Sequence, residues 1–182
     1  MNRNDALTLL KEYTKNDALL KHMYAVEAAM IAYARKFGED ELKWGMTGLL
    51  HDFDYEMYPN PPDHPMKGSE VLKEKGYPED MRKAILGHAT YTGVPRDTQM
   101  AKALYACDEL CGFIMACSVI RPNKIADLEV SSVKKKLKDK AFARNVSRED
   151  ITEGTADLGL QLDDHIKFVI DAMKQISPEL GL

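Results

Sequence analysis

The chain has 182 residues, a net charge of −4 and a pI of about 5.8. Its 45% apolar and 30% charged residues are typical of a folded domain and argue against a disordered chain. The acidic balance argues against general nucleic-acid binding, for which proteins are usually basic. No apolar run approaches the ~20 residues of a membrane span, and "MNRNDALTLLKEYTKND" lacks the apolar segment of a signal peptide. We therefore expect a cytoplasmic protein with no membrane partner.

Apolar residues recur at helical spacing along the chain, and no segment alternates apolar and polar residues as a strand would. Capping residues, glycines and prolines mark the helix ends. The pattern predicts helices over residues 4–13, 16–38, 39–52, 65–76, 78–89, 98–120, 130–143, 148–154 and 155–176. A Pro-rich loop over 58–65 interrupts the series, because its prolines cannot lie inside a regular helix. The expected fold is an all-α, single-domain helical bundle over residues 1–182.

Three cysteines lie in one apolar stretch, "LYACDELCGFIMACSVI". Cys107, Cys111 and Cys117 are an odd number at helical spacing, which indicates reduced, buried thiols and not a disulfide framework. The absence of a CxxC pair argues against a zinc site built on these residues.

Four of the five histidines and two aspartates fall at helix ends or on apolar helix faces. They are His22, His51, Asp52, His64, His88 and Asp108. A carboxylate in surroundings as apolar as "ALYACDELCGF" needs compensation, and a metal ion is one natural source of it. A single histidine on an apolar face is more often a packing residue than a ligand, so the combination carries the argument. His165, in "LQLDDHIKF", has no partner in this pattern, and we interpret it as structural or exposed.

The order of these residues resembles the HD-domain superfamily of metal-dependent phosphohydrolases. "GLLHDFDYE" is similar to the signature of that family, and "HPMKGSEVLKEKGYPEDMRKAILGHA" is similar to a segment of its two-metal, HDIG-type members. "ALYACDELCGF" resembles the helix that supplies the last aspartate. The resemblance covers a core of about 18–118 and leaves a C-terminal helical cap of about 119–182. Asp54-Tyr55 stand where HDIG-type members usually have Gly-Lys.

The resemblance implies a binuclear metal site and phosphoester hydrolysis. His22, His51, Asp52 and Asp108 would hold one ion, and His64 and His88 a second, with Asp52 bridging both. Imidazole and carboxylate ligands suit divalent Fe, Mn, Co, Ni or Zn. The implied reaction is attack of metal-activated hydroxide on the phosphate ester of a small molecule, a nucleotide being one candidate. Asp52 and Asp54 are the catalytic candidates, since Asp54 could orient the water or a ligating histidine.

Several features could serve the substrate, each with an ordinary structural alternative. Arg121 and Lys124, in "VIRPNK", are candidate substrate-binding residues, although Arg121 could equally cap a helix C-terminus. The lysine-rich segment 131–148 is either a solvated helix face or a phosphate-steering surface. Trp44, Tyr55, Tyr58 and Tyr91 could stack on a base, but such residues more often pack in the core.

Two other functions remain open from the sequence. Some HD-superfamily members resemble this ligand pattern and activate O₂, so a di-iron oxygenase is one alternative. A non-catalytic ligand-binding HD module with a vestigial metal site is the other.

Overall fold

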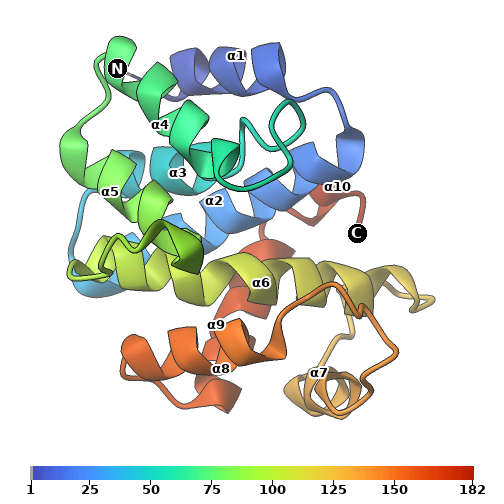
Figure 1. Cartoon of the computed structure of the whole chain (residues 1–182). Coiled ribbons are helices and arrows are strands. Elements are labelled where there is room, and N and C mark those ends of the chain that lie inside the picture. Colours follow the sequence, from blue (N-terminus) through green and yellow to red (C-terminus); the bar gives the residue numbers. More distant parts are fainter. Residues whose placement is uncertain (1) are drawn as a thin grey trace.

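The computed structural model describes residues 2–182, which form ten α-helices, one short 3₁₀-helix and no strand (Figure 1). The helices are α1 (Arg3–Tyr13), α2 (Asp17–Phe37), α3 (Glu41–Leu50), α4 (Asp63–Glu74), α5 (Glu79–His88), α6 (Gln99–Val119), α7 (Val130–Leu137), α8 (Arg148–Asp157), α9 (Leu162–Lys174) and α10 (Ser177–Leu180). The predicted all-α class is confirmed. None of the helices in the described range is both long and apolar enough to cross a membrane.

The ends of the long helices follow from the residues beside them. Asn16 precedes α2 and accepts hydrogen bonds from the backbone N–H groups of Ala18 and Leu19, which satisfies two donors that the helix itself cannot use. Gly38 ends the same helix at φ 72°, a left-handed conformation that glycine adopts without strain. Thr98 caps the start of α6 in the same way as Asn16 caps α2.

Helix α6 is the centre of the bundle. In Figure 1 it lies between the N-terminal helices α1–α5 and the C-terminal helices α7 and α8, and α9 passes behind it. It packs against α2, α5, α8 and α9, and α9 also contacts α2. One continuous apolar core runs from Ala6 in α1 to Leu180 in α10. A residue at the middle of α6 is therefore surrounded by helices from both halves of the chain.

Helices α2 and α3 pack closely because α3 carries glycines where they meet. A Cβ atom on Gly48 would lie 2.9 Å from the carbonyl oxygen of Val26 and 3.0 Å from the backbone nitrogen of Glu27. A side chain at that position would therefore push the two helices apart. The close approach matters because His22 lies on α2 and His51 directly follows α3.

The sequence-based boundaries are wrong in three places. The single helix predicted over 155–176 is divided, because Gly159 adopts φ 73° and breaks it between α8 and α9. The helix predicted over 130–143 ends at Leu137. The helix predicted from Pro65 begins at Asp63, although His64 and Pro65 depart from helical dihedral angles. His64 is extended at ψ 135°, as expected for a residue that precedes proline.

Candidate metal centre

Six side chains from separate parts of the sequence meet beside α6. His22 comes from the second turn of α2, His51 and Asp52 from the end of α3, His64 from the start of α4, His88 from the end of α5, and Asp108 from the middle of α6. Their ligating atoms form two groups, and within each group every atom lies within 4.8 Å of the others. Asp52 belongs to both groups.

The first group has the spacing of a metal coordination shell. His22 Nε2 lies 3.0 Å from Asp108 Oδ1 and 3.2 Å from His51 Nε2. His51 Nε2 lies 3.3 Å from Asp108 Oδ1 and 3.6 Å from Asp52 Oδ2. Donor atoms held ~2.0–2.1 Å from one tetrahedral ion would lie about 3.3 Å apart. The four side chains therefore fit around a single ion with little movement.

The second group is built on the other oxygen of Asp52. Oδ1 lies 3.2 Å from His64 Nε2 and 3.1 Å from His88 Nε2. It is nevertheless a buried atom that accepts no hydrogen bond. An unsatisfied buried carboxylate oxygen is costly, and a cation between these three donors would satisfy it.

The imidazole rings are oriented by hydrogen bonds on their outer nitrogens. Nδ1 of His51 contacts Gly48 O at 2.8 Å, Nδ1 of His88 contacts Ile85 O, and Nδ1 of His64 contacts Asp54 Oδ1 at 2.8 Å. These oxygens only accept, so each Nδ1 donates, and in the neutral ring Nε2 carries a lone pair toward the cluster. Ligating histidines in metalloproteins are held in the same way.

The electrostatics of the cluster favour positive charge at its centre. Burial lowers the pKa of His51, but the carboxylates of Asp52 and Asp108 outweigh burial and raise it above its ordinary value. The pKa of His64 rises to about 9 in spite of its burial, because it contacts the carboxylates of Asp52 and Asp54. Burial raises the pKa of a carboxyl group. The neighbouring histidines outweigh this effect and hold the pKa of Asp52 and of Asp108 below the usual range. A bound cation would supply the charge that these groups otherwise obtain from protons.

A cavity of about 500 Å³ opens over the cluster. Besides His22, Asp52, His64, His88 and Asp108, its lining residues are Tyr55, Pro59, Pro61, Ala89, Thr90, Tyr91, Tyr105, Glu109, Gly112, Val146 and Asp150. Burial and the neighbouring Asp108 raise the pKa of Glu109 to about 7. Sequence reasoning missed Glu109 and Asp150, because neither belongs to a motif and Asp150 reaches the cavity from α8 only through the fold.

Asp54 lies beneath His64 and is fully buried. Its Oδ1 accepts from the ring of His64, and its Oδ2 accepts from the backbone N–H of Gly68 at 2.8 Å. A Cβ atom on Gly68 would lie 2.7 Å from Asp54 Cγ, so only glycine leaves room for this carboxylate. The contact with His64 is the one that the second role expected for Asp54, the orientation of a histidine, requires.

The two predicted substrate-binding residues lie outside the cavity wall. The Arg121 guanidinium donates to Asp127 Oδ1 at 2.9 Å, and the Lys124 ammonium donates to Gly181 O at 2.6 Å. Both follow the C-terminus of α6, more than three turns beyond Asp108. Arg121 therefore stabilises the loop that follows α6, and Lys124 joins this loop to the C-terminal residues. The structure brings neither of them to the cluster.

The four aromatic candidates fall into different environments, and Tyr58 is half-buried and is not among the residues that line the cavity. Trp44 is a core residue, whereas Tyr55 and Tyr91 line the cavity and are 39% and 51% exposed. His165 is buried away from the cluster, where it accepts from the Tyr33 hydroxyl at 2.6 Å and donates to Ala106 O at 2.9 Å. It is therefore a structural residue.

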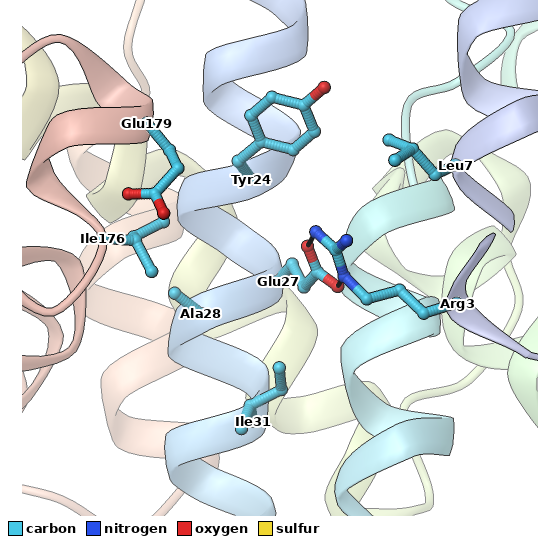
Figure 2. A pocket seen from close by; sticks show the side chains of 8 residues that line it. All are labelled: Arg3, Leu7, Tyr24, Glu27, Ala28, Ile31, Ile176 and Glu179. Carbon is cyan, nitrogen blue, oxygen red and sulfur yellow. Dashed lines mark hydrogen bonds and ion pairs between the residues drawn. The ribbon is translucent and has the colours of Figure 1, made fainter.

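A second cavity lies between α1, α2 and the C-terminal residues (Figure 2). Its volume is about 360 Å³, and its walls include Leu7, Ile31 and Ile176. The buried carboxylate of Glu27 is already paired with Arg3 through two contacts of 2.6 and 2.8 Å. This cavity contains no group of donors comparable to the cluster beside α6.

Comparison with known proteins agrees with the geometry of the cluster. The family model for the HD domain matches residues 19–111, half of the chain, and this range includes all six clustered residues. The chain belongs to the HD-domain family. HD domains are mostly metal-dependent phosphohydrolases, and the histidines and aspartates of this HD domain are placed to bind metal. No curated protein and no solved structure matches the chain.

Proposed function

We propose that this HD domain is a metal-dependent phosphohydrolase that cleaves a phosphate ester of a small molecule. The observation that carries the proposal is the shared carboxylate of Asp52, whose two oxygens face two groups of imidazole nitrogens. His22, His51, Asp52 and Asp108 would hold one divalent ion, and Asp52, His64 and His88 a second. Such ions lower the pKa of a bound water and neutralise charge that develops on phosphoryl oxygens.

The chain's own residues prepare this chemistry. Asp54, Gly48 O and Ile85 O hold three of the rings with their Nε2 lone pairs toward the cluster, so little reorganisation is needed when an ion binds. The buried side of the cluster excludes bulk water, while the cavity admits a substrate to the other side. The ester would be cleaved by attack of water on phosphorus, with the P–O bond to the alcohol breaking and that alcohol leaving.

The direct test is Asp52→Asn, which replaces the shared carboxylate by a weaker, neutral ligand of the same size. We expect elemental analysis to find two divalent ions in the wild-type protein and none or one in the variant. Phosphate release from a panel of phosphate monoesters should fall at least 100-fold, the upper end of the loss expected for a disturbed metal site.

The matched control is Asp164→Asn, which makes the same chemical change at an exposed position of α9. It should retain both the ions and the activity. A wild-type protein that releases no phosphate but takes up O₂ when loaded with iron would instead support the oxygenase alternative. A metal-loaded protein that binds a ligand and turns nothing over would support the non-catalytic alternative.

A further inference from the structure

The cavity over the cluster has an unusual charge for a phosphate-binding site. Among its described lining residues there are four carboxylates, of Asp52, Asp108, Glu109 and Asp150, and no lysine or arginine. Proteins that bind several phosphate groups usually provide arginine or lysine for them. The metal ions of the proposed function would therefore supply the positive charge within this cavity. The Arg96 guanidinium is not part of the lining, but it lies over the Tyr105 ring, 3.7 Å from its centroid.

A charge balance shows how much phosphate the cavity can accept. Two divalent ions carry four positive charges, and the carboxylates of Asp52 and Asp108, which face them, remove two. At most two positive charges remain, so the ions offset no more than one phosphoryl dianion. Glu109 and Asp150 lie outside both groups of metal ligands and add negative charge that a single phosphoryl group leaves uncompensated.

Glu109 and Asp150 are held on one wall, where α6 meets the start of α8. Glu109 Oε2 accepts from the backbone N–H of Ser147 at 3.1 Å, and Ser147 Oγ accepts from the backbone N–H of Asp150 at 3.1 Å. The first contact makes one oxygen of Glu109 part of the N-terminal cap of α8. Both residues line the cavity, where the Tyr105 hydroxyl also contacts the Asp150 carboxylate.

Aromatic rings complete the cavity away from the ions. Tyr91 donates through its hydroxyl to His64 O, and the Tyr55 ring meets the His64 ring edge-on at 5.2 Å between centroids. Both rings stay substantially exposed at the cavity mouth. Aromatic faces attract cations, and carboxylates do so more strongly. The wall composition therefore suits an organic cation and disfavours a chain of phosphates.

We propose that Glu109 and Asp150 determine specificity by binding a positively charged group of the substrate. The substrate is then a phosphate monoester of a small amine-bearing alcohol, and nucleoside polyphosphates are excluded. The proposal rests on the proposed function for the position of the phosphoryl group, but the preference for a cation depends only on the acidic wall.

The test compares ligands that differ by an ammonium in place of a methyl group. Isothermal titration of the metal-loaded protein would use 3-aminopropylphosphonate and butylphosphonate, which cannot be hydrolysed as esters. We expect the amine to bind at least 10-fold more tightly. In the double variant Glu109→Gln/Asp150→Asn the ratio should fall close to one. Both replacements keep the size of the side chain, and the amide oxygen introduced by Glu109→Gln would still accept from the backbone N–H of Ser147.

The control is Glu149→Gln/Asp164→Asn, which removes the same charge from exposed positions outside the cavity. It should keep the preference for the amine. The same comparison by turnover uses 3-aminopropyl phosphate and butyl phosphate. Equal binding and equal turnover of the two members of each pair would overturn the specificity proposal and leave the phosphohydrolase standing. Preferential binding of the aminophosphonate without turnover of either ester would support the acidic wall and overturn the proposed function.

Discussion

Asp54 contacts the outer nitrogen of the His64 ring, and this contact bears on the orientation of that ring. Its two oxygens accept from two donors, the ring of His64 and the backbone N–H of Gly68. Asp54→Asn offers one oxygen and one NH₂ group to these two donors, so one of the contacts becomes donor against donor. We expect His64 to lose its orientation and the affinity for one of the two ions to fall ~10–100-fold, measured by metal titration.

Gly68→Ala tests the same contact from the other side. The new methyl group would overlap Asp54 Cγ at 2.7 Å and displace the carboxylate. Gly112→Ala is the matched control in α6, since its methyl group would lie 3.9 Å from the nearest atom, His22 Nδ1, an ordinary van der Waals contact. Equal metal affinity in the two variants would contradict the role of Asp54.

His165 predicts a specific dependence of stability on pH. Burial lowers the pKa of His165 to about 4, below the ~6.5 of an unfolded chain. Above pH ~6.5 both states are neutral at this position and its contribution to stability is complete. As the pH falls from 6.5 to 4 the unfolded state takes up a proton and the folded state does not, so about 3 kcal/mol of unfolding free energy is lost.

His165→Gln removes this titration. Urea unfolding of the metal-free proteins at several pH values should show a shallower decline for the variant, because the clustered histidines contribute equally to both. Parallel pH profiles would mean that His165 is not buried in its neutral form.

At the scale of elements, the packing of α3 on α2 sets the distance between His22 and His51. Gly48→Ala would place a methyl group against the α2 backbone, which cannot move without shifting the helix. We expect a loss of about 1–3 kcal/mol in unfolding free energy and weaker binding of the ion that His22 shares with His51. Urea unfolding and metal titration measure the two effects.

Gly45→Ala provides the comparison one turn earlier on α3. Its methyl group would meet the Ile31 side chain at 2.8 Å, and Ile31 borders the cavity of Figure 2, into which it can turn. The higher helix propensity of alanine, worth up to about 1 kcal/mol, offsets part of this contact. A Gly45→Ala variant as damaged as Gly48→Ala would show that the close backbone approach is not what matters.

The helices themselves were largely readable from the sequence because their ends carry local signals. Asn16 and Gly38 cap α2 at the two ends of the range predicted for this helix, 16–38, since capping depends on residues next to one another in the chain. The division between α8 and α9 was missed because Gly159 lies inside an otherwise helical pattern, and only its left-handed backbone shows the break. The start of α4 was predicted at Pro65 because proline favours the first position of a helix, whereas α4 begins at Asp63 with a kink at His64 and Pro65.

At the scale of the whole molecule, the six candidate metal ligands lie on or directly beside five helices, α2 to α6. Ions bound there stabilise the folded state only, by about 4 kcal/mol when their concentration is ~1,000 times the dissociation constant. We expect a chelator to lower the unfolding free energy of the wild-type protein by this order. Thermal unfolding with and without chelator measures the change.

The same chelator should change the stability of Asp52→Asn much less, because the variant binds fewer ions. An equal shift in both proteins would place the stabilising ions elsewhere.

The order of histidines and aspartates along the chain was enough to predict which side chains gather, because a family resemblance preserves that order. The charge of the cavity could not be predicted from the sequence, since it depends on which residues of α8 face α6. Arg121 and Lys124 illustrate the limit: they are close to Asp108 in sequence, but a straight helix carries them ~20 Å away from it. Glu109, which directly follows Asp108 in α6, was overlooked because it belongs to no motif.

The three cysteines of α6 allow the separation of the surrounding helices to be measured by thiol labelling. Cys107, Cys111 and Cys117 are buried, and burial raises the pKa of each thiol, that of Cys117 to about 11. Thiol reagents attack the thiolate, so the folded chain resists alkylation until α6 is uncovered. Because Cys107 is the neighbour of Asp108, the speed at which iodoacetamide labels it reports how often the helices around the cluster separate, with no dye or engineered residue.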